Sequence, residues 1–233
     1  MPDELAWTGH GDPAGPPVVF LHGTPGSADD HPPASGARLI RVERPGYRGS
    51  APSRRPTLLG VADGIAALMD SLGIERFGVL GFSGGAPYAA ACGARFPHRL
   101  TGVVTASFTG PDRELHTVHG AERRQAWALR HVPGRGRRFV TRAAAGFGPD
   151  ASGVAGDWLA TDIRPWGFRL REVTCRTLIW AGADDPGRAA PDAPLIAARL
   201  PAAEVDIAAA GHTPGPAHWA SMLAWLSSGP TFS

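Results

Sequence analysis

The chain has 233 residues, 43% of them hydrophobic and 19% charged, so it is long enough for one domain with a large core and has an ordinary globular composition. The net charge is +2 at neutral pH and the basic residues are scattered, so we expect no nucleic-acid partner. All basic residues other than histidine are arginine, and the absence of lysine excludes a lysine Schiff base, a P-loop lysine and a Ser-Lys dyad.

The N-terminus and the apolar runs predict a cytoplasmic protein without a membrane partner. The opening Met-Pro-Asp-Glu-Leu lacks the basic and apolar regions of a signal peptide. No apolar run approaches the roughly 18 residues that a bilayer span requires. The two cysteines, Cys92 and Cys175, do not suggest a disulfide scaffold or a zinc cluster.

In the first hundred residues, short apolar runs alternate with helical patterns. Helices are predicted over Thr57–Leu72, where apolar residues recur at helical spacing, and over Gly85–Phe96, which is small and apolar. Strands are predicted over Val18–His22, Arg38–Val42, Phe77–Phe82 and Leu100–Ala106. Strands that are apolar throughout favour an α/β fold with a mostly parallel sheet that is covered on both faces.

The alternation breaks between residues 107 and 172. This stretch has no clear strand and contains Arg-rich helical segments such as Ala121–Arg130. We therefore predict a small helical cap over 107–172, inserted into a core formed by residues 1–106 and 173–233. The core pattern resumes with strand Thr177–Ala181, helix Ala193–Leu200, strand Glu204–Ala208 and helix Pro216–Leu226.

The strongest functional signal is Gly81-Phe82-Ser83-Gly84-Gly85, which follows a predicted strand and precedes a predicted helix. This G-x-S-x-G pattern is typical of a nucleophile elbow, in which the serine occupies a sharp, strained turn and stands clear of the sheet. The glycines two residues before and after the serine avoid a clash across that turn. We therefore predict Ser83 as a nucleophile; a phosphate-binding turn is the alternative.

A serine hydroxyl is a weak nucleophile and requires a base. His212 is the best candidate, because it lies in a short loop after the last predicted strand, and such loops gather at the edge of the sheet where Ser83 lies. His218 is expected on the surface of the last helix. The remaining candidates are expected in the cap or beside Arg-rich segments: His98, His116, His119 and His131.

The base needs a carboxylate that orients it, and the oxyanion needs backbone donors. Asp184 and Asp185 both follow the strand that begins at Thr177, and Asp112 is a third possibility. For the oxyanion hole we expect the backbone N–H groups of Gly84 and Thr24. Pro25, the next residue of the His22 loop, has no N–H to donate, and His22 itself is expected to brace that loop.

Together these segments resemble the α/β-hydrolase superfamily, in particular its small bacterial serine-nucleophile members of the esterase-like and proline-iminopeptidase-like branches. The matching segments are His22–Pro25, Arg44–Ser50, the elbow at 81–85, Gly182–Asp185 and Gly211–His212. The resemblance implies the α/β-hydrolase fold and the order Ser…Asp…His. Its Gly-x-x-Asp pattern favours Asp185 over Asp184. The chain departs from the family in one respect: few residues precede the strand predicted from Val18, so we expect the family's leading hairpin to be short or missing.

The resemblance implies a serine hydrolase that cleaves a carboxylic ester, thioester or lactone. A serine nucleophile speaks against the family's epoxide hydrolases and haloalkane dehalogenases, which use aspartate. The same triad also serves non-hydrolytic cyclases, lyases and acyltransferases, and some receptors retain it for ligand binding.

We expect a small-molecule acyl substrate, no cofactor, no metal and a monomer or homodimer. The cap holds eleven Arg against seven Asp plus Glu, which suits a neutral or anionic substrate better than an amine. His116 and His119 have helical spacing, but no third ligand accompanies them. The residues expected to line the substrate pocket are Phe82, Trp127, Trp158 and Trp166.

Overall fold

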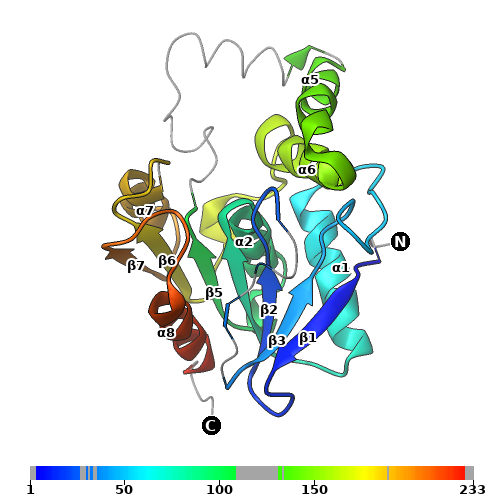
Figure 1. Cartoon of the computed structure of the whole chain (residues 1–233). Helices are drawn as coiled ribbons and strands as arrows, with labels where there is room; N and C mark the ends of the chain where they lie inside the picture. The colour runs from blue at the N-terminus through cyan, green and yellow to red at the C-terminus, as the bar shows by residue number, and fades with distance from the viewer. Residues whose placement is uncertain are drawn as a thin grey trace.

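The computed structural model describes residues 4–26, 30, 32–33, 36–108, 131–132, 134–187 and 189–228. These residues form a seven-stranded sheet in the order β1-β3-β2-β4-β5-β6-β7 (Figure 1). The β1 strand runs antiparallel to its neighbour β3, and all other neighbouring pairs are parallel. The strands are β1 (Trp7–Gly11), β2 (Pro17–Leu21), β3 (Arg38–Val42), β4 (Phe77–Phe82), β5 (Leu100–Ala106), β6 (Thr177–Gly182) and β7 (Ala203–Ala208).

Helices cover both faces of this sheet, which explains why its central strands are apolar throughout. Alternate residues such as Val19 and Val79 face one core cluster, with α1 (Leu58–Ser71) and α2 (Ala86–Arg95). The intervening residues face a second cluster, with α8 (Pro216–Ser227). A third cluster joins α7 (Ala189–Ala197) to β6. The predicted mostly parallel α/β sheet, covered on both faces, is thus confirmed.

The predicted strands and helices of the core are found with boundaries shifted by at most a few residues. Thr57 caps α1, because its hydroxyl accepts a hydrogen bond of 3.0 Å from the Gly60 N–H. The α7 helix begins at Ala189, four residues before the predicted start.

The β1 strand was not among the predicted strands, although a short leading hairpin was one of the two expectations. The β1 strand lies at the edge of the sheet, and its residues are largely exposed. It therefore lacks the apolar pattern by which the other strands were recognised.

The segment between β5 and β6 contributes helices and no strand among its described residues. Figure 1 places α5 (Arg135–Ala144) and α6 (Ala151–Trp158) beyond the arrow tips of the central strands. Both helices pack in one small apolar cluster together with Tyr47. The division into core and cap remains a prediction, and Ala121–Arg130 lies outside the described residues.

Within the described ranges, no helix combines the length and apolarity that a membrane span requires.

Candidate active site

Ser83 occupies the sharp turn between β4 and α2, the position that the elbow motif predicts. Its backbone φ is +49°, a left-handed value that a non-glycine residue rarely adopts. A Cβ added to Gly81 would lie 2.5 Å from the Gly85 carbonyl oxygen, and one added to Gly85 would lie 2.6 Å from the His22 carbonyl oxygen. The two glycines therefore allow the close backbone approach on which the turn depends.

The structure brings Ser83, His212 and Asp185 together, although they come from three distant parts of the chain. The Ser83 Oγ lies 3.0 Å from His212 Nε2, and His212 Nδ1 lies 2.8 Å from Asp185 Oδ2. The Asp185 side chain is 2% exposed and the His212 side chain 44%. Asp185 Oδ1 also accepts a 2.8 Å hydrogen bond from the Gly187 N–H, which fixes the carboxylate, whereas Asp184 is exposed.

This arrangement specifies the tautomer that a catalytic histidine needs. The Asp185 carboxylate only accepts hydrogen bonds, so it favours the proton on His212 Nδ1. The Nε2 lone pair is then free to accept the hydroxyl proton of Ser83.

Ser107 binds the backbone of the loop that contains His212. Its hydroxyl donates a 2.5 Å hydrogen bond to the carbonyl oxygen of His212. Ser107 follows β5 directly, is buried and has a φ of +55°, a second strained residue beside the elbow. It was not among the residues predicted for the site.

Thr24 and Gly84, the expected oxyanion-hole residues, are close neighbours. A Cβ added to Gly84 would lie 2.6 Å from Thr24 Cβ and 3.0 Å from Thr24 N. Thr24 follows β2 and Gly84 follows Ser83, so both residues lie at the same edge of the sheet as Ser83.

A pocket of about 220 Å³ opens over these residues. Trp158 and Trp166 line it, as expected, and Trp166 stacks on Phe108 with ring centroids 5.9 Å apart. The described residues of its lining are Thr24, Ser83, Gly84, Pro87, Ser107, Phe108, Trp158, Thr161, Asp162, Trp166 and His212.

Phe82, which was expected to line the pocket, is not among the described residues of that lining. The ring of Phe82 packs against the rings of His212 and Trp219, with centroids 5.3 Å and 5.6 Å away, so Phe82 supports the histidine instead of facing the pocket. Trp127 lies outside the described residues, as do His116 and His119. Among the residues that are described, no group of three His, Cys, Asp or Glu side chains could hold a metal ion.

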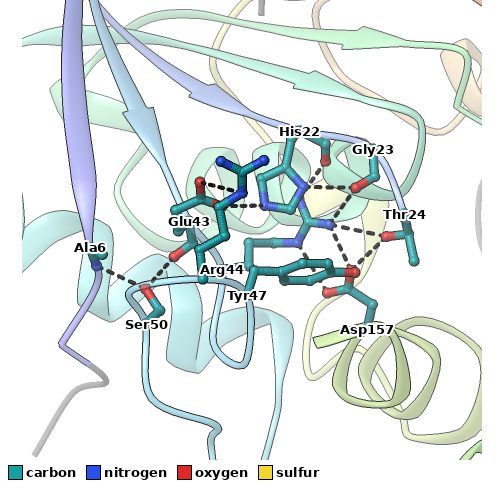
Figure 2. Close-up of polar contacts among 10 residues, drawn as sticks. Ala6, His22, Gly23, Thr24, Glu43, Arg44, Tyr47, Ser50 and Asp157 are labelled. Carbon is teal, nitrogen blue, oxygen red and sulfur yellow. Dashed lines mark hydrogen bonds and ion pairs between the residues drawn. The ribbon is translucent and has the colours of Figure 1, made fainter. Parts of the chain in front are cut away.

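The Thr24 loop lies against Arg44, a buried residue of the Arg44–Ser50 segment. The Arg44 guanidinium donates a hydrogen bond to the carbonyl oxygen of His22 and another, 2.9 Å long, to the carbonyl oxygen of Gly23 (Figure 2). Its partner is the carboxylate of Asp157 on α6, 2.6 Å away. Sequence reasoning did not predict a role for Asp157. The one signal was that Asp157 is the single charged residue in Ala151–Trp158, a helix of mostly small residues.

His22 braces the same loop as a neutral imidazole. Its Nδ1 donates a 2.8 Å hydrogen bond to the Gly23 carbonyl. Burial and the neighbouring Arg44 guanidinium lower the pKa of His22 to about 3. The 3.6 Å contact between His22 Nε2 and the Glu43 carboxylate is therefore not an ion pair at neutral pH.

Comparison with known proteins supports the fold. A family model described as alpha/beta hydrolase fold matches residues 16–145. No curated protein matches the sequence significantly.

Several solved structures share the fold over almost the whole chain. A thermophilic esterase from Thermogutta terrifontis has 22% identity and a TM-score of 0.69, with 95% of this chain and 92% of that chain covered. The haloalkane dehalogenase DbeA from Bradyrhizobium elkani USDA94 has 23% identity and a TM-score of 0.69, with coverage of 95% and 93%. The enol-lactonase from Burkholderia xenovorans LB400 has 20% identity and a TM-score of 0.69, with coverage of 96% and 96%. Since the three named activities differ, the reaction has to be argued from the site.

Proposed function

Because this chain belongs to the α/β-hydrolase fold family, we propose that it is a serine hydrolase that cleaves a carboxylic ester, thioester or lactone of a small acyl substrate through an acyl-enzyme on Ser83. The observation that carries this proposal is the relay from Ser83 through His212 to Asp185, with contacts of 3.0 Å and 2.8 Å, beside a pocket. Such a relay turns a weakly nucleophilic hydroxyl into one that attacks a carbonyl carbon.

In the first half of the reaction, Ser83 Oγ attacks the acyl carbon while His212 Nε2 takes the hydroxyl proton. The resulting imidazolium is stabilised by Asp185. The tetrahedral oxyanion accepts hydrogen bonds from the backbone N–H groups of Thr24 and Gly84. Collapse of this intermediate breaks the bond to the leaving alcohol or thiol, which receives the proton from His212.

In the second half, water replaces the leaving group. His212 removes a proton from the water as its oxygen attacks the acyl carbon of the ester on Ser83. Collapse of the second intermediate releases the carboxylic acid and returns the proton to Ser83 Oγ. The net change is the addition of one water molecule across the ester bond.

The pocket favours a short acyl group or a small lactone. Its volume of about 220 Å³ lies below the roughly 300–1,000 Å³ that is usual for drug-sized ligands. The rings of Trp158, Trp166 and Phe108 supply apolar walls against which an alkyl or aryl group would pack.

The direct test is covalent labelling with a fluorophosphonate, combined with turnover of p-nitrophenyl esters of increasing chain length. We expect Ser83→Ala to abolish labelling and to lower turnover on the order of 10⁶-fold. Ser71→Ala, which changes an exposed serine on α1, is the matched control and should behave as wild type. Labelling that persists in Ser83→Ala would remove Ser83 from the mechanism. Turnover without release of the carboxylic acid would indicate a lyase, cyclase or acyltransferase instead.

A further inference from the structure

The carboxylate of Asp157 accepts five hydrogen bonds beside the site (Figure 2 draws all of its partners except Tyr88). Its Oδ2 accepts from Thr24 Oγ1 at 2.5 Å, from Arg44 Nη2 at 2.6 Å and from the Tyr47 hydroxyl at 2.7 Å. Its Oδ1 accepts from Arg44 Nε at 3.0 Å and from the Tyr88 hydroxyl at 2.8 Å. One carboxylate on α6 thus joins four side chains of the sheet-forming part of the chain.

Asp157 and Arg44 are both charged although their side chains are buried. Burial alone would raise the pKa of Asp157, but the Arg44 guanidinium and the hydrogen bonds from Arg44 and Thr24 lower it below its ordinary value. Burial and the adjacent carboxylate raise the pKa of Tyr47 and of Tyr88, so both hydroxyls keep the protons that they donate. Asp157 therefore remains an anion that attracts every donor around it.

Stability is a poor explanation for such a cluster. Burying an ion pair removes two charges from water, and apolar side chains of similar size often stabilise a protein as well or better. The Arg44 side chain is fully buried and the Asp157 side chain is 4% exposed, so this desolvation cost applies in full. Buried polar groups do, in some systems, fix one arrangement of the chain.

In this protein, the cluster fixes the Thr24 loop relative to the segment after Asp157 that lines the pocket. The hydroxyl of Thr24 is bound by Asp157, while the backbone N–H of the same residue is the expected oxyanion donor. The helical residues directly after Asp157 include Trp158 and Thr161, which line the pocket. Thr161 in addition donates a 2.9 Å hydrogen bond to the Asp157 carbonyl.

We propose that Asp157 is a positioning residue that holds the Thr24 backbone donor in the oxyanion hole, and so ties the oxyanion hole to the helix that forms the pocket wall. Asp157 does not line the pocket itself, so it acts through Thr24 and not on the substrate. The inference rests on the proposed role of Ser83 as an acyl-accepting nucleophile.

The test compares Asp157→Asn, Thr24→Val and the double variant in the full-length protein. Asparagine keeps the shape of Asp157 but removes the charge, and valine keeps the shape of Thr24 but removes the hydroxyl that Asp157 binds. We expect each single variant to slow fluorophosphonate labelling of Ser83 and to lower kcat for p-nitrophenyl acetate by about tenfold to a hundredfold, with little change in KM. We expect the double variant to be no slower than the slower single variant, because both changes break one connection.

A purely structural role gives a different result. The variants would then unfold at lower temperature, but their folded fraction would label at the wild-type rate, and this outcome would overturn the inference. Asp63→Asn, which breaks the exposed 2.7 Å pair with Arg95 between α1 and α2, controls for the loss of an Asp–Arg pair. If Asp157→Asn does not fold, Thr24→Val decides. It leaves the bonds from Arg44, Tyr47 and Tyr88 to Asp157 in place and removes only the two bonds of the Thr24 hydroxyl, to Asp157 and from Arg44.

The wild-type protein separates the two proposals. If it neither labels at Ser83 nor turns over esters, the proposed function fails and the inference fails with it. If it labels while Asp157→Asn and Thr24→Val label equally fast, only the inference is wrong.

Discussion

The substitution Gly84→Ala tests whether the Thr24 loop has to lie against the residue that follows Ser83. The added methyl group would be 2.6 Å from Thr24 Cβ and closer still to Thr24 Oγ1. Thr24 cannot yield by rotating its side chain freely, since its hydroxyl is bound by Asp157 and Arg44. The backbone of one of the two loops must therefore move.

The size of the movement follows from ordinary contact distances. Two carbon atoms pack at about 3.5 Å, so the new methyl group and Thr24 Cβ would have to separate by about 0.9 Å. A misplacement of about 1 Å near the reacting atoms can cost on the order of 10² in rate. Loss of one oxyanion-hole donor costs about 10²–10³ in kcat. We therefore expect Gly84→Ala to lower kcat by about 10²-fold, which is about 2.7 kcal/mol of transition-state stabilisation.

The assay is steady-state turnover of p-nitrophenyl acetate, with circular dichroism to establish that the variant is folded. Gly211→Ala is the matched control, because Gly211 directly precedes His212 but a Cβ added to it would meet no atom within 4 Å. It should keep the wild-type kcat. A folded Gly84→Ala enzyme with wild-type kcat would refute the argument that these two backbone donors form the oxyanion hole.

Three further substitutions, with Asp184→Asn as a control, examine other parts of the site. Asp185→Asn should lower kcat on the order of 10⁴-fold, because an amide no longer selects the needed imidazole tautomer, whereas the exposed Asp184→Asn should retain it; equal losses in kinetic assays would contradict the assignment. Ser107→Ala removes the hydrogen bond to the His212 carbonyl and should lower kcat about tenfold, an expectation that unchanged kinetics would exclude. The pKa of His22 is about 3 in the folded chain and 6.5 ordinarily, so below pH 6.5 the unfolded chain binds a proton that the folded chain does not bind. As the pH is lowered from 6.5, the free energy of unfolding should therefore fall by up to about 1.4 kcal/mol per pH unit. In urea unfolding, His22→Asn should show a shallower pH dependence than wild type, and parallel curves would disprove the neutral, buried imidazole.

Much of the core fold could be predicted because its signals are local. Strands buried on both faces are short apolar runs, and the elbow combines a strand, a serine and closely spaced glycines within a few residues. The β1 strand escaped prediction for the opposite reason. It is exposed at the edge of the sheet, so what defines it is its pairing with β3, more than 25 residues further along the chain.

The residues of the candidate site differed in how well the sequence alone could identify them. Ser83 and His212 stand in distinctive local contexts, whereas Asp184 and Asp185 are neighbours in one turn and were separated only by resemblance to a family. In the structure, one carboxylate turns inward to His212 and the other faces solvent. Phe82 shows the reverse case, since its place beside the nucleophile suggested a pocket role and its side chain points to the histidine instead.

The amino-acid sequence by itself determined the repeated strand and helix pattern, the strained turn at Ser83 and the types of residue that could carry acyl chemistry. These depend on backbone preferences and apolar periodicity, which act over a few residues. Only the tertiary structure decided which carboxylate reaches the imidazole, and that Asp157 meets Arg44 across 113 positions of the chain. Such contacts depend on how separate segments pack in space, because the attraction of a buried charge for its donors arises only once folding has removed the water between them.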